Sequence, residues 1–353
     1  MPLRGVSAGK VRLASIGAGM IGQVHAKVLA RLEECEYVAL CDMDPAKEKM
    51  AAELGTRYYR DHLEMMDREK PDGVVVSVPN EMHEAVGLEC AGRGIHVFME
   101  KPLTTTLESA DRLIEGARKH KVKLVCGHHR RFNPKINAVR DAIRSGELGS
   151  LVGVNVFWCM YKPSEYFVAG EWRRRKGGGP ILINTIHEID NLRYVCGEIS
   201  RVYAEVSNKT RGFEVEDTVS VSVRFKDGTL GSILMSDAAP SLWGYESNLG
   251  ENPFFHPTTS DIYHYLGTKA SLTFPGLIKV FYPDPAKAGW QHPLGMQQLR
   301  APAWDTYTEQ MRSFCRVVRG EEEPRTSGED ARRTLQVIQA VAESSQTHRP
   351  IEL

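Results

Sequence analysis

Residues 11–22 read VRLASIGAGMIG, and this stretch decides the fold of the first third of the chain. An apolar run from Val11 to Ile16 is typical of a buried strand, and the segment from Met20 to Arg31 has the length and period of a helix. The glycines between them match the pattern G-x-G-x-x-G, with a strand before it and a helix after it. The stretch therefore predicts the first strand, turn and helix of a parallel α/β domain.

The three glycines of this pattern have separate expected tasks. Gly17 permits the tight turn, Gly19 lets the backbone approach a pyrophosphate, and Gly22 allows the helix to pack closely on the strand. The helix N-terminus then faces the anion. We predict a dinucleotide-binding loop of Gly17, Gly19, Met20, Ile21 and Gly22; the alternative is a glycine turn that binds no ligand.

An acidic residue after the next apolar run supports the dinucleotide hypothesis. Asp42 follows residues 37–41, at 25 residues after the first glycine, close to the spacing of the carboxylate that accepts ribose hydroxyls. A carboxylate there repels a 2′-phosphate, so the predicted cofactor is NAD rather than NADP. Asp44 is the competing candidate, but it precedes Pro45 and is expected to cap the next helix. His25 is expected to be packed and hydrogen-bonded.

Strand and helix patterns alternate through the rest of the first third. This alternation predicts a doubly wound parallel sheet, a Rossmann domain over residues 1–129. The further expected strands are 37–41, 74–78, 95–99 and 122–126, and the further expected helices are 45–54, 82–93 and 107–120.

The pattern changes after about residue 127, and residues 130–353 are predicted to form a second α/β domain. Apolar and polar residues alternate more regularly in its expected strands than in those of the first domain. Asp227-Gly228 lies between two of these strands and predicts a hairpin, so we expect a mostly antiparallel sheet. The expected strands are 151–160, 201–207, 216–225 and 229–235, and the expected helices are 134–145, 304–319 and 328–347. Residues 240–257 are too irregular to assign.

Composition limits the class of function. The 353 residues suggest two domains, and 45 basic residues balance 45 acidic ones at a sequence pI near 7.2. Nothing in this balance attracts nucleic acid or an anionic membrane, so the expected partner is a small molecule. The seven cysteines are scattered, as is typical of reduced thiols, and the sequence shows neither a signal peptide nor an apolar run long enough to span a bilayer. We therefore expect a cytoplasmic protein. Neither HExxH nor a Cys/His cluster with zinc spacing occurs, so no metal is predicted.

Two segments carry candidate chemistry. Glu100-Lys101-Pro102 follows an expected strand at the carboxyl edge of the sheet, where doubly wound folds bind ligands. Pro102 restricts Lys101 to extended geometry, and an ammonium there would stabilise an alkoxide as hydride leaves an alcohol carbon. From spacing alone, an ordinary solvated lysine is an equal alternative.

The second segment is a helix that Pro180 begins and Gly197 ends, after the run Gly177-Gly178-Gly179. The glycines are expected to let the backbone approach a ligand. A helical wheel groups Asn184, His187, Glu188 and Asn191 on a side that faces solvent or a cleft. The imidazole of His187 is a suitable base near neutral pH, with a surface histidine as the alternative.

With these residues in hand, the chain resembles the glucose-fructose oxidoreductase, inositol dehydrogenase and rhizopine-catabolism (Gfo/Idh/MocA) family over nearly its full length. The motifs that carry the resemblance are GAGMIGQVHA at 17–26, VPNEMH at 78–83, EKPL at 100–103, RRFNP at 130–134 and GGGPILINTIHEID at 177–190. The resemblance implies a Rossmann domain followed by an α/β domain with an open, mostly antiparallel sheet that builds dimers or tetramers. It also implies oxidation of sugars, polyols or related ring alcohols, or the reverse reduction.

By the same resemblance, Lys101 matches the family's catalytic lysine and His187 matches its catalytic histidine. Some members carry an aspartate one turn before that histidine, where this chain has Ile183; the nearest polar residue is Asn184, which we include among the catalytic candidates. Pro79, Asn80 and His83 match the loop that borders the cofactor, and Glu100 and Lys101 are also expected at the cofactor site. Trp172 and Arg173 match the lining of the substrate pocket, and Arg131, Asn133 and Pro134 match a segment near the domain junction.

Two other functions remain open. Some proteins of this fold are NAD-dependent glycosidases, which oxidise a sugar transiently and eliminate the aglycone, and one resembling protein is a non-catalytic regulator. Retention of both Lys101 and His187 favours an oxidoreductase.

Overall fold

The computed structural model describes residues 9–252 and 254–353, which form two compact units. The first unit comprises the chain up to Phe132 and the segment Trp304–Leu335; the second comprises Asn133–Ala303 and Gln336–Leu353. This division differs from the single boundary after residue 129 that the sequence suggests. The reason is that residues 304–335 pack their apolar side chains on the first sheet, which local sequence pattern does not reveal.

The first unit is built on a six-stranded sheet in the order β3-β2-β1-β4-β5-β6, and every strand pair in it is parallel. Its strands are β1 (Val11–Ile16), β2 (Cys35–Cys41), β3 (Arg57–Tyr59), β4 (Gly73–Val76), β5 (His96–Met99) and β6 (Leu124–Cys126). The strand order reverses between β1 and β4, and sheets of this type bind ligands at such a switch point, outside the carboxyl ends of the strands.

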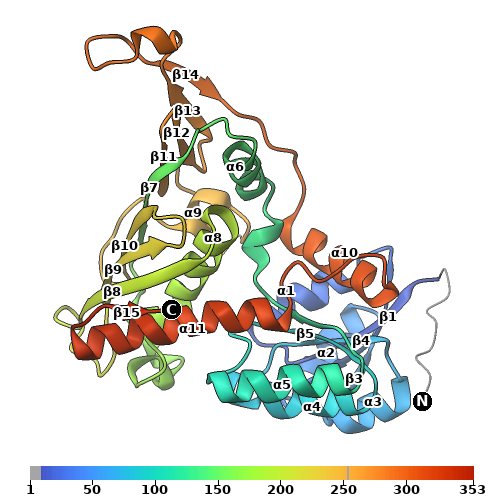
Figure 1. Cartoon of the computed structure of the whole chain (residues 1–353). Helices are drawn as coiled ribbons and strands as arrows, with labels where there is room; N and C mark the ends of the chain where they lie inside the picture. Colours follow the sequence, from blue (N-terminus) through green and yellow to red (C-terminus); the bar gives the residue numbers. More distant parts are fainter. Residues whose placement is uncertain (1–8, 253) are drawn as a thin grey trace. The chain divides into compact units, whose positions relative to one another are not determined.

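Helices cover both faces of this sheet (Figure 1). One face packs against α3 (His62–Glu69), α4 (His83–Gly92) and α5 (Leu107–Lys119), and the other against α1 (Met20–Leu29) and α10 (Thr306–Arg319). Ala51 of α2 (Lys47–Glu53) packs on the α1 side. Because the strands are buried on both faces, they are nearly continuous apolar runs, and the predicted Rossmann fold is confirmed.

The second unit contains a nine-stranded mixed sheet in the order β14-β13-β12-β11-β7-β10-β9-β8-β15. All neighbours are antiparallel except β7 and β10, which are parallel, and Gly228 at φ +96° forms the predicted turn between β9 and β10. The strands are β7 (Leu151–Cys159), β8 (Ile199–Ser207), β9 (Thr218–Phe225), β10 (Leu230–Ser236), β11 (Tyr263–Gly267), β12 (Ala270–Phe274), β13 (Ile278–Phe281), β14 (Gly295–Gln298) and β15 (Ile351–Glu352).

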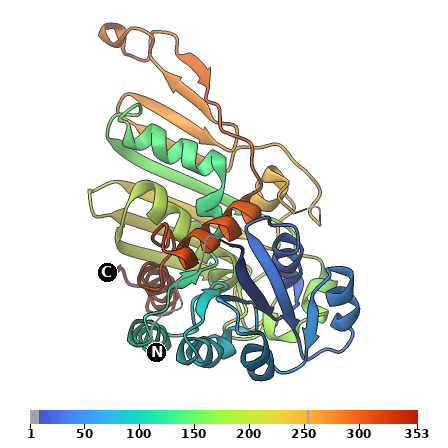
Figure 2. The ribbon, with the colours of Figure 1, turned by 90° about the vertical axis from the view of Figure 1, so that its right-hand side faces the viewer.

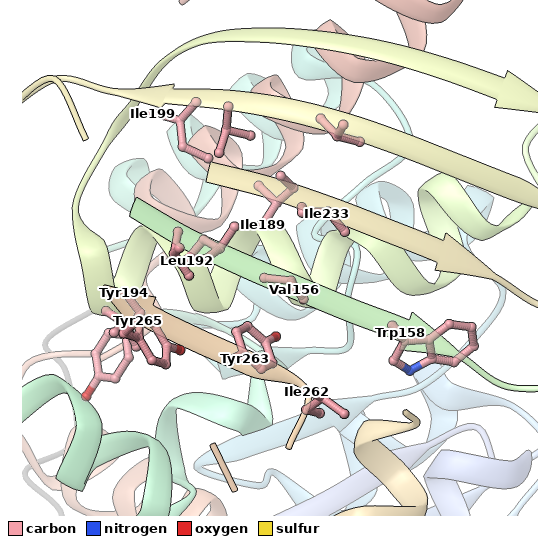
Figure 3. Packing of buried hydrophobic residues seen from close by; sticks show 14 of the residues in the cluster. Val156, Trp158, Ile189, Leu192, Tyr194, Ile199, Ile233, Ile262, Tyr263 and Tyr265 are labelled. Carbon is pink, nitrogen blue, oxygen red and sulfur yellow. The ribbon is translucent and has the colours of Figure 1, made fainter. Parts of the chain in front are cut away.

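One face of this sheet carries the core of the second unit. Helices α6 (Pro134–Arg144; Figure 2), α8 (Ile186–Cys196) and the second half of α11 (Gly328–Thr347) contribute to it. Figure 3 shows Ile189 and Leu192 of α8 against Val156 and Ile233 of the central strands. Short helical segments complete the unit: α7 (Ser164–Val168), η3 (Glu171–Arg174), η4 (Ile181–Thr185), α9 (Tyr245–Leu249) and η5 (Pro285–Lys287); η1 (Asn80–Met82) and η2 (His129–Phe132) belong to the first unit.

The opposite face of the second sheet is covered by no helix of this unit among the described residues. It carries small polar side chains on β9 together with the apolar Phe157, Leu234 and Leu266. Among the described residues, the helices include none that is both long and apolar enough to cross a lipid bilayer.

Candidate active site

The glycine loop after β1 has the backbone geometry that the sequence predicts. Gly17 has φ +91°, and a Cβ atom on it would lie 2.4 Å from the carbonyl oxygen of Ser77, in the loop after β4. A Cβ on Gly22 would lie 2.1 Å from the carbonyl oxygen of Gly17. Gly17 and Gly22 are thus required by close backbone packing at the switch point of the sheet.

Gly19 is different, because no heavy atom of the described chain lies within 4 Å of where its Cβ would be. Gly19 is the N-cap of α1, and no side chain among the described residues caps this helix end. The neighbouring Met20 is exposed, Ile21 is half-buried, and the buried hydroxyl of Ser77 has no hydrogen-bond partner in the described part of the chain. An uncapped helix N-terminus beside open space fits a pyrophosphate.

Asp42 is held against this loop. Its Oδ2 accepts a hydrogen bond from the backbone N–H of Ala18 at 2.6 Å, and its Oδ1 accepts one from the N–H of Asp44 at 2.8 Å. The carboxylate of Asp44 accepts from the N–H of Ala46 at 3.0 Å, directly before α2, and Met43 is 75% exposed. Asp42 is therefore the carboxylate that belongs to the glycine loop, whereas Asp44 organises the start of the next helix.

The loop predicted to border the cofactor divides into exposed and buried residues. Pro79 is exposed and Asn80 is half-buried, so both side chains reach the surface of the first unit. His83 is buried: its Nδ1 lies 2.9 Å from the carbonyl oxygen of Pro102 and its Nε2 lies 3.1 Å from that of Val78. Burial lowers the pKa of His83, although both carbonyl contacts oppose this. His83 therefore braces the loop after β4 against the segment after β5.

Glu100 and His25 form a buried pair at the carboxyl end of β5. His25 Nε2 lies 2.7 Å from Glu100 Oε1, which confirms that His25 is packed and hydrogen-bonded. Burial acts to raise the pKa of Glu100, but the hydrogen bond from His25 and the charges of neighbouring cationic groups, including Lys101, bring it below its usual value. The other oxygen, Oε2, accepts from the backbone N–H of Lys101 at 3.1 Å. Glu100 thus anchors the backbone that carries Lys101.

Lys101 itself is half-buried at the carboxyl edge of the sheet, and the peptide bond that joins it to Pro102 is cis. Nearby, His129 stacks on Tyr307 of α10, with ring centroids 5.0 Å apart. Burial lowers the pKa of His129 to about 3. The charge of Lys101 is one of the neighbouring positive charges that also act to lower the pKa of His129.

In the second unit, the turn η4 is a π-helix that runs directly into α8, with Pro180 at its start and Gly197 at φ +105° at the end of α8. The glycine run before it is packed tightly against neighbouring chain. A Cβ on Gly178 would lie 2.2 Å from the carbonyl oxygen of Trp172, and one on Gly179 would lie 2.3 Å from Oε1 of Glu216. Two of the three glycines are thus required by packing inside the unit.

Of the two surroundings expected for the polar side of α8, solvent or a cleft, the structure excludes solvent. His187 is 9% exposed, Glu188 is 1% exposed and Asn191 is fully buried, so the helix is buried on all sides. Glu188 accepts a hydrogen bond from the hydroxyl of Tyr263 in β11. Buried polar side chains are usually hydrogen-bonded, as Glu188 is, whereas neither amide atom of Asn191 has a partner in the described part of the chain.

Asn184, in the π-turn one turn before His187, is bound by a lysine that the sequence analysis missed. Lys162 Nζ donates to Asn184 Oδ1 at 2.7 Å and lies 3.3 Å from Asp237 Oδ2. Asp237 also accepts from Arg211 Nε at 2.8 Å. Burial lowers the pKa of Lys162, and Asp237 opposes that shift. Because an ammonium can only donate, the amide oxygen of Asn184 faces Lys162 and its NH₂ group points elsewhere.

The two candidates for substrate binding in the second unit lie in η3. Trp172 is exposed, and Arg173 is half-buried, with its Nη1 donating to the carbonyl oxygen of Tyr166. Lys162 lies just after an expected strand and far from Asn184 in sequence, so nothing local distinguishes it from a solvated surface lysine.

Near the start of α6, Asn133 accepts from two backbone N–H groups and Pro134 opens the helix, while Arg131 pairs with Asp330 within the first unit.

Comparison with known proteins identifies the family. The model for an oxidoreductase family with an NAD-binding Rossmann fold matches residues 11–128, and that for the GFO/IDH/MocA C-terminal domain matches residues 136–251. The chain belongs to the Gfo/Idh/MocA family. It is thus an oxidoreductase with an NAD-binding domain, and the resemblance drawn from its motifs is confirmed.

Members of this family that are similar to the chain include two curated proteins. The rhizopine catabolism protein MocA of Rhizobium meliloti is 30% identical over 259 residues, which cover 70% of this chain and 80% of that protein. A myo-inositol 2-dehydrogenase of Thermotoga maritima is 26% identical over 352 residues, which cover 97% of this chain and 98% of its own. Among solved structures, a probable dehydrogenase of Thermotoga maritima is 27% identical with a TM-score of 0.77, and the match covers 97% and 98% of the two chains.

Proposed function

We propose that this oxidoreductase transfers hydride between a secondary alcohol of a sugar, polyol or related ring alcohol and NAD. The observation that carries the proposal is the glycine loop, where Asp42 is fixed against Ala18 and Gly19 opens onto free space. The full-length similarity to a protein named as an inositol dehydrogenase supports an alcohol carbon on a ring as the reacting group. NAD, when bound, would accept the hydride with its electron pair.

NAD rather than NADP is the proposed cofactor because of the charge at the end of β2. The Asp42 carboxylate is a hydrogen-bond acceptor for ribose hydroxyls and repels a 2′-phosphate, and the following Met43 offers no guanidinium that would bind one. Gly17, Gly19, Met20, Ile21 and Gly22 would hold the pyrophosphate, and the loop with Pro79 and Asn80 would border the cofactor. The buried His83 and Glu100 contribute by fixing the segments around them.

Lys101 and His187 are the proposed catalytic residues. As the hydride leaves, the alcohol oxygen gathers negative charge, which the Lys101 ammonium stabilises. The neutral imidazole of His187 takes the hydroxyl proton. In this scheme neither side chain is needed to hold NAD.

Asn184 is proposed as a hydrogen-bond donor to the substrate rather than as part of a proton relay. Its amide oxygen is committed to Lys162, so its NH₂ group is the part available to a hydroxyl or carbonyl oxygen. An amide does not take up a proton near neutral pH. The resemblance implies that some family members have an aspartate at the position of Ile183, so in this chain Asn184 next to it would supply a positioning hydrogen bond and no carboxylate.

We also propose that the protein is cytoplasmic and assembles as a homodimer or homotetramer. All seven cysteines are free thiols, as expected in a reducing compartment. The face of the second sheet that carries Phe157, Leu234 and Leu266 is the proposed assembly surface.

The proposed function is tested by a panel of inositols, polyols, aldoses and ring diols incubated with added NAD. The expected result is stoichiometric formation of reduced nicotinamide with at least one of these compounds. The absorbance of the reduced nicotinamide measures it. A glycosidase that recycles a retained cofactor would give no such net reduction. Absence of net reduction with the whole panel, and of the reverse reaction with the matching ketones, would contradict the proposal.

A further inference from the structure

Next to the proposed substrate-binding segment, the second unit holds a cluster of cations stacked on aromatic rings. Tyr166 in α7 lies between two of them: the guanidinium of Arg173 is 3.9 Å from its ring centroid, and Lys162 Nζ is 5.2 Å from it. Arg211 lies over Phe167 at 4.5 Å. Aromatic faces orient such cations while leaving their N–H groups available in the plane of the guanidinium.

A fourth cation, Arg174, extends this cluster. Its guanidinium lies 5.3 Å from the ring centroid of Phe213, and the Phe213 ring is 5.0 Å from that of Phe167. The side chains of Lys162, Arg173, Arg174 and Arg211 are therefore gathered around one connected set of rings, although they come from three separate stretches of the sequence.

The acidic groups of the region are engaged elsewhere. Asp237 pairs with both Lys162 and Arg211. Glu246 accepts from the indole N–H of Trp158 at 2.9 Å. Glu216 accepts from the backbone N–H of Ile181 at 2.8 Å, and burial raises its pKa. Each carboxylate thus already has a donor that is not Arg173 or Arg174.

Arg173 and Arg174 have no carboxylate within salt-bridge distance among the described residues, in contrast to the neighbouring Arg175, which pairs with Glu171 at 3.6 Å. The Nε atoms of both Arg173 and Arg174 are buried, and neither has a hydrogen-bond partner in the described part of the chain. A buried donor without an acceptor is costly, and more so when it carries charge. Two adjacent, half-buried guanidinium groups therefore lack an anionic acceptor.

This pair of arginines is joined to the helix that carries His187. The Cα of Gly178 packs so closely that an added Cβ would lie 2.7 Å from the Cα of Arg173. Lys162, on the same aromatic ring as Arg173, donates to Asn184 in the turn before His187. The two guanidinium groups, which have no carboxylate partner among the described residues, therefore belong to the same local structure as Asn184.

We propose that the substrate of this enzyme carries an anionic group, a carboxylate or a phosphate, which Arg173 and Arg174 bind. The inference rests on the proposed function, since it specifies the alcohol as an acidic sugar or an acidic ring polyol. The planar, five-donor guanidinium matches the two oxygens of a carboxylate or phosphate, and Lys162 contributes a further positive charge at the edge of the site.

The test compares neutral and anionic sugars that differ at one substituent. D-galactose is compared with D-galacturonate for a carboxylate, and D-glucose with D-glucose 6-phosphate for a phosphate. Dissociation constants are measured by calorimetry on the NADH-saturated protein, and kcat/KM for NAD reduction is measured in parallel. We expect one anionic sugar to bind about ten- to a hundredfold more tightly than its neutral partner, the range for a charged hydrogen bond.

Arg173→Gln and Arg174→Gln are the test variants, each of which keeps a polar side chain of similar reach and removes one charge. Each is expected to bring the ratio of anionic to neutral affinity close to one. Arg175→Gln is the matched control, because it removes the same charge from the same segment at an exposed side chain that is already paired. Circular dichroism and thermal melting test whether each variant is folded. If one of the two test variants is unfolded, the affinity ratio of the other one decides whether the inference holds.

The inference is overturned if both neutral sugars bind as tightly as their anionic partners, or if Arg175→Gln lowers the ratio as much as the two test variants do. It is also overturned if both test variants keep the wild-type ratio of anionic to neutral affinity. Failure of the proposed function gives another result: no NAD reduction with any sugar, while calorimetry still reports the anionic preference and its loss in Arg173→Gln.

Discussion

The carboxylate of Asp42, at the end of β2, accepts a hydrogen bond at 2.6 Å from the backbone N–H of Ala18, inside the glycine loop after β1. The residue that would read the ribose is therefore tied to the loop that would hold the pyrophosphate. A carboxylate fixed in this way keeps its position before the cofactor arrives, so little ordering is needed on binding.

Replacement of Asp42 by alanine is expected to lower NAD affinity by about tenfold or more, because a charged acceptor for the ribose is lost. The ratio of NAD to NADP affinity should fall with it. Asp44→Ala is the control, since that carboxylate only accepts from Ala46 at the exposed start of α2. Calorimetry with both cofactors on the wild type and the two variants measures the six dissociation constants; tighter binding of NADP by the wild-type protein would contradict the assignment.

Two glycines of the loop should respond to alanine in opposite ways. In Gly22→Ala the new methyl group meets the carbonyl oxygen of Gly17, and we expect a loss of about 1–3 kcal/mol in unfolding free energy. In Gly19→Ala the methyl group meets nothing within 4 Å in the described chain, so stability should be retained while NAD affinity falls. Chemical denaturation and calorimetry separate the two effects. Full NAD affinity in Gly19→Ala would mean that the open space is not the pyrophosphate site.

Lys101→Ala and His187→Ala should each lower kcat by about a hundred- to ten-thousandfold, the range for a positioned acid or base, with little change in NAD affinity. Asn184→Ala should cost less than either, because it removes a hydrogen-bond donor and leaves the proton acceptor in place. Steady-state kinetics on the substrate found in the alcohol panel, with NAD affinity measured separately, checks this order. Near-wild-type turnover in His187→Ala would show that the histidine is not the base.

Acid should destabilise the protein through His129. Burial lowers its pKa from the ordinary 6.5 to about 3 in the folded protein, so the unfolded chain binds the proton first. The corresponding contribution to stability is complete above pH 6.5 and declines as pH falls toward 3. His129→Phe keeps a ring against Tyr307 and removes the titration, so its unfolding free energy should fall less steeply between pH 6.5 and 4.5. Parallel slopes for the two proteins across this window would refute the claim.

Self-association should depend on the helix-free face of the second sheet. Light scattering at micromolar concentration should report a multiple of the 39.5 kDa chain mass. Leu234→Glu puts a charge on an exposed side chain of β10 and should shift the protein toward the monomer without changing its circular dichroism. A wild-type mass near 39.5 kDa would rule out the proposed assembly.

Much of the fold was predictable from local pattern. The expected bounds of β1 and α11 agree with the structure, because each is a run of one period with clear end signals. By contrast β3 and α3 were missed, since a three-residue strand and an eight-residue helix of low mean hydropathy carry too few apolar positions to stand out. The strands from β11 to β14 were missed as well, in a region of short elements separated by irregular chain.

The candidate site shows the same limit at the level of single residues. Gly17, Gly22 and Asp42 could be assigned from sequence because their tasks are set by backbone conformation at known offsets along one strand, turn and helix. Lys162 could not, because its significance comes from partners at 184 and 237, which only the packing of the second unit brings to it.

The sequence by itself determined the Rossmann unit, the family and the candidate pair Lys101 and His187, because these depend on periodicity and on motifs that are local in the chain. The tertiary structure alone decided that α8 is buried on every side, that Asn184 is oriented by Lys162, and that Arg173 and Arg174 have no acidic partner within residues 9–252 and 254–353. The physical reason is that burial and charge pairing are sums over neighbours in space. A helical wheel or a run of basic residues contains only neighbours in sequence.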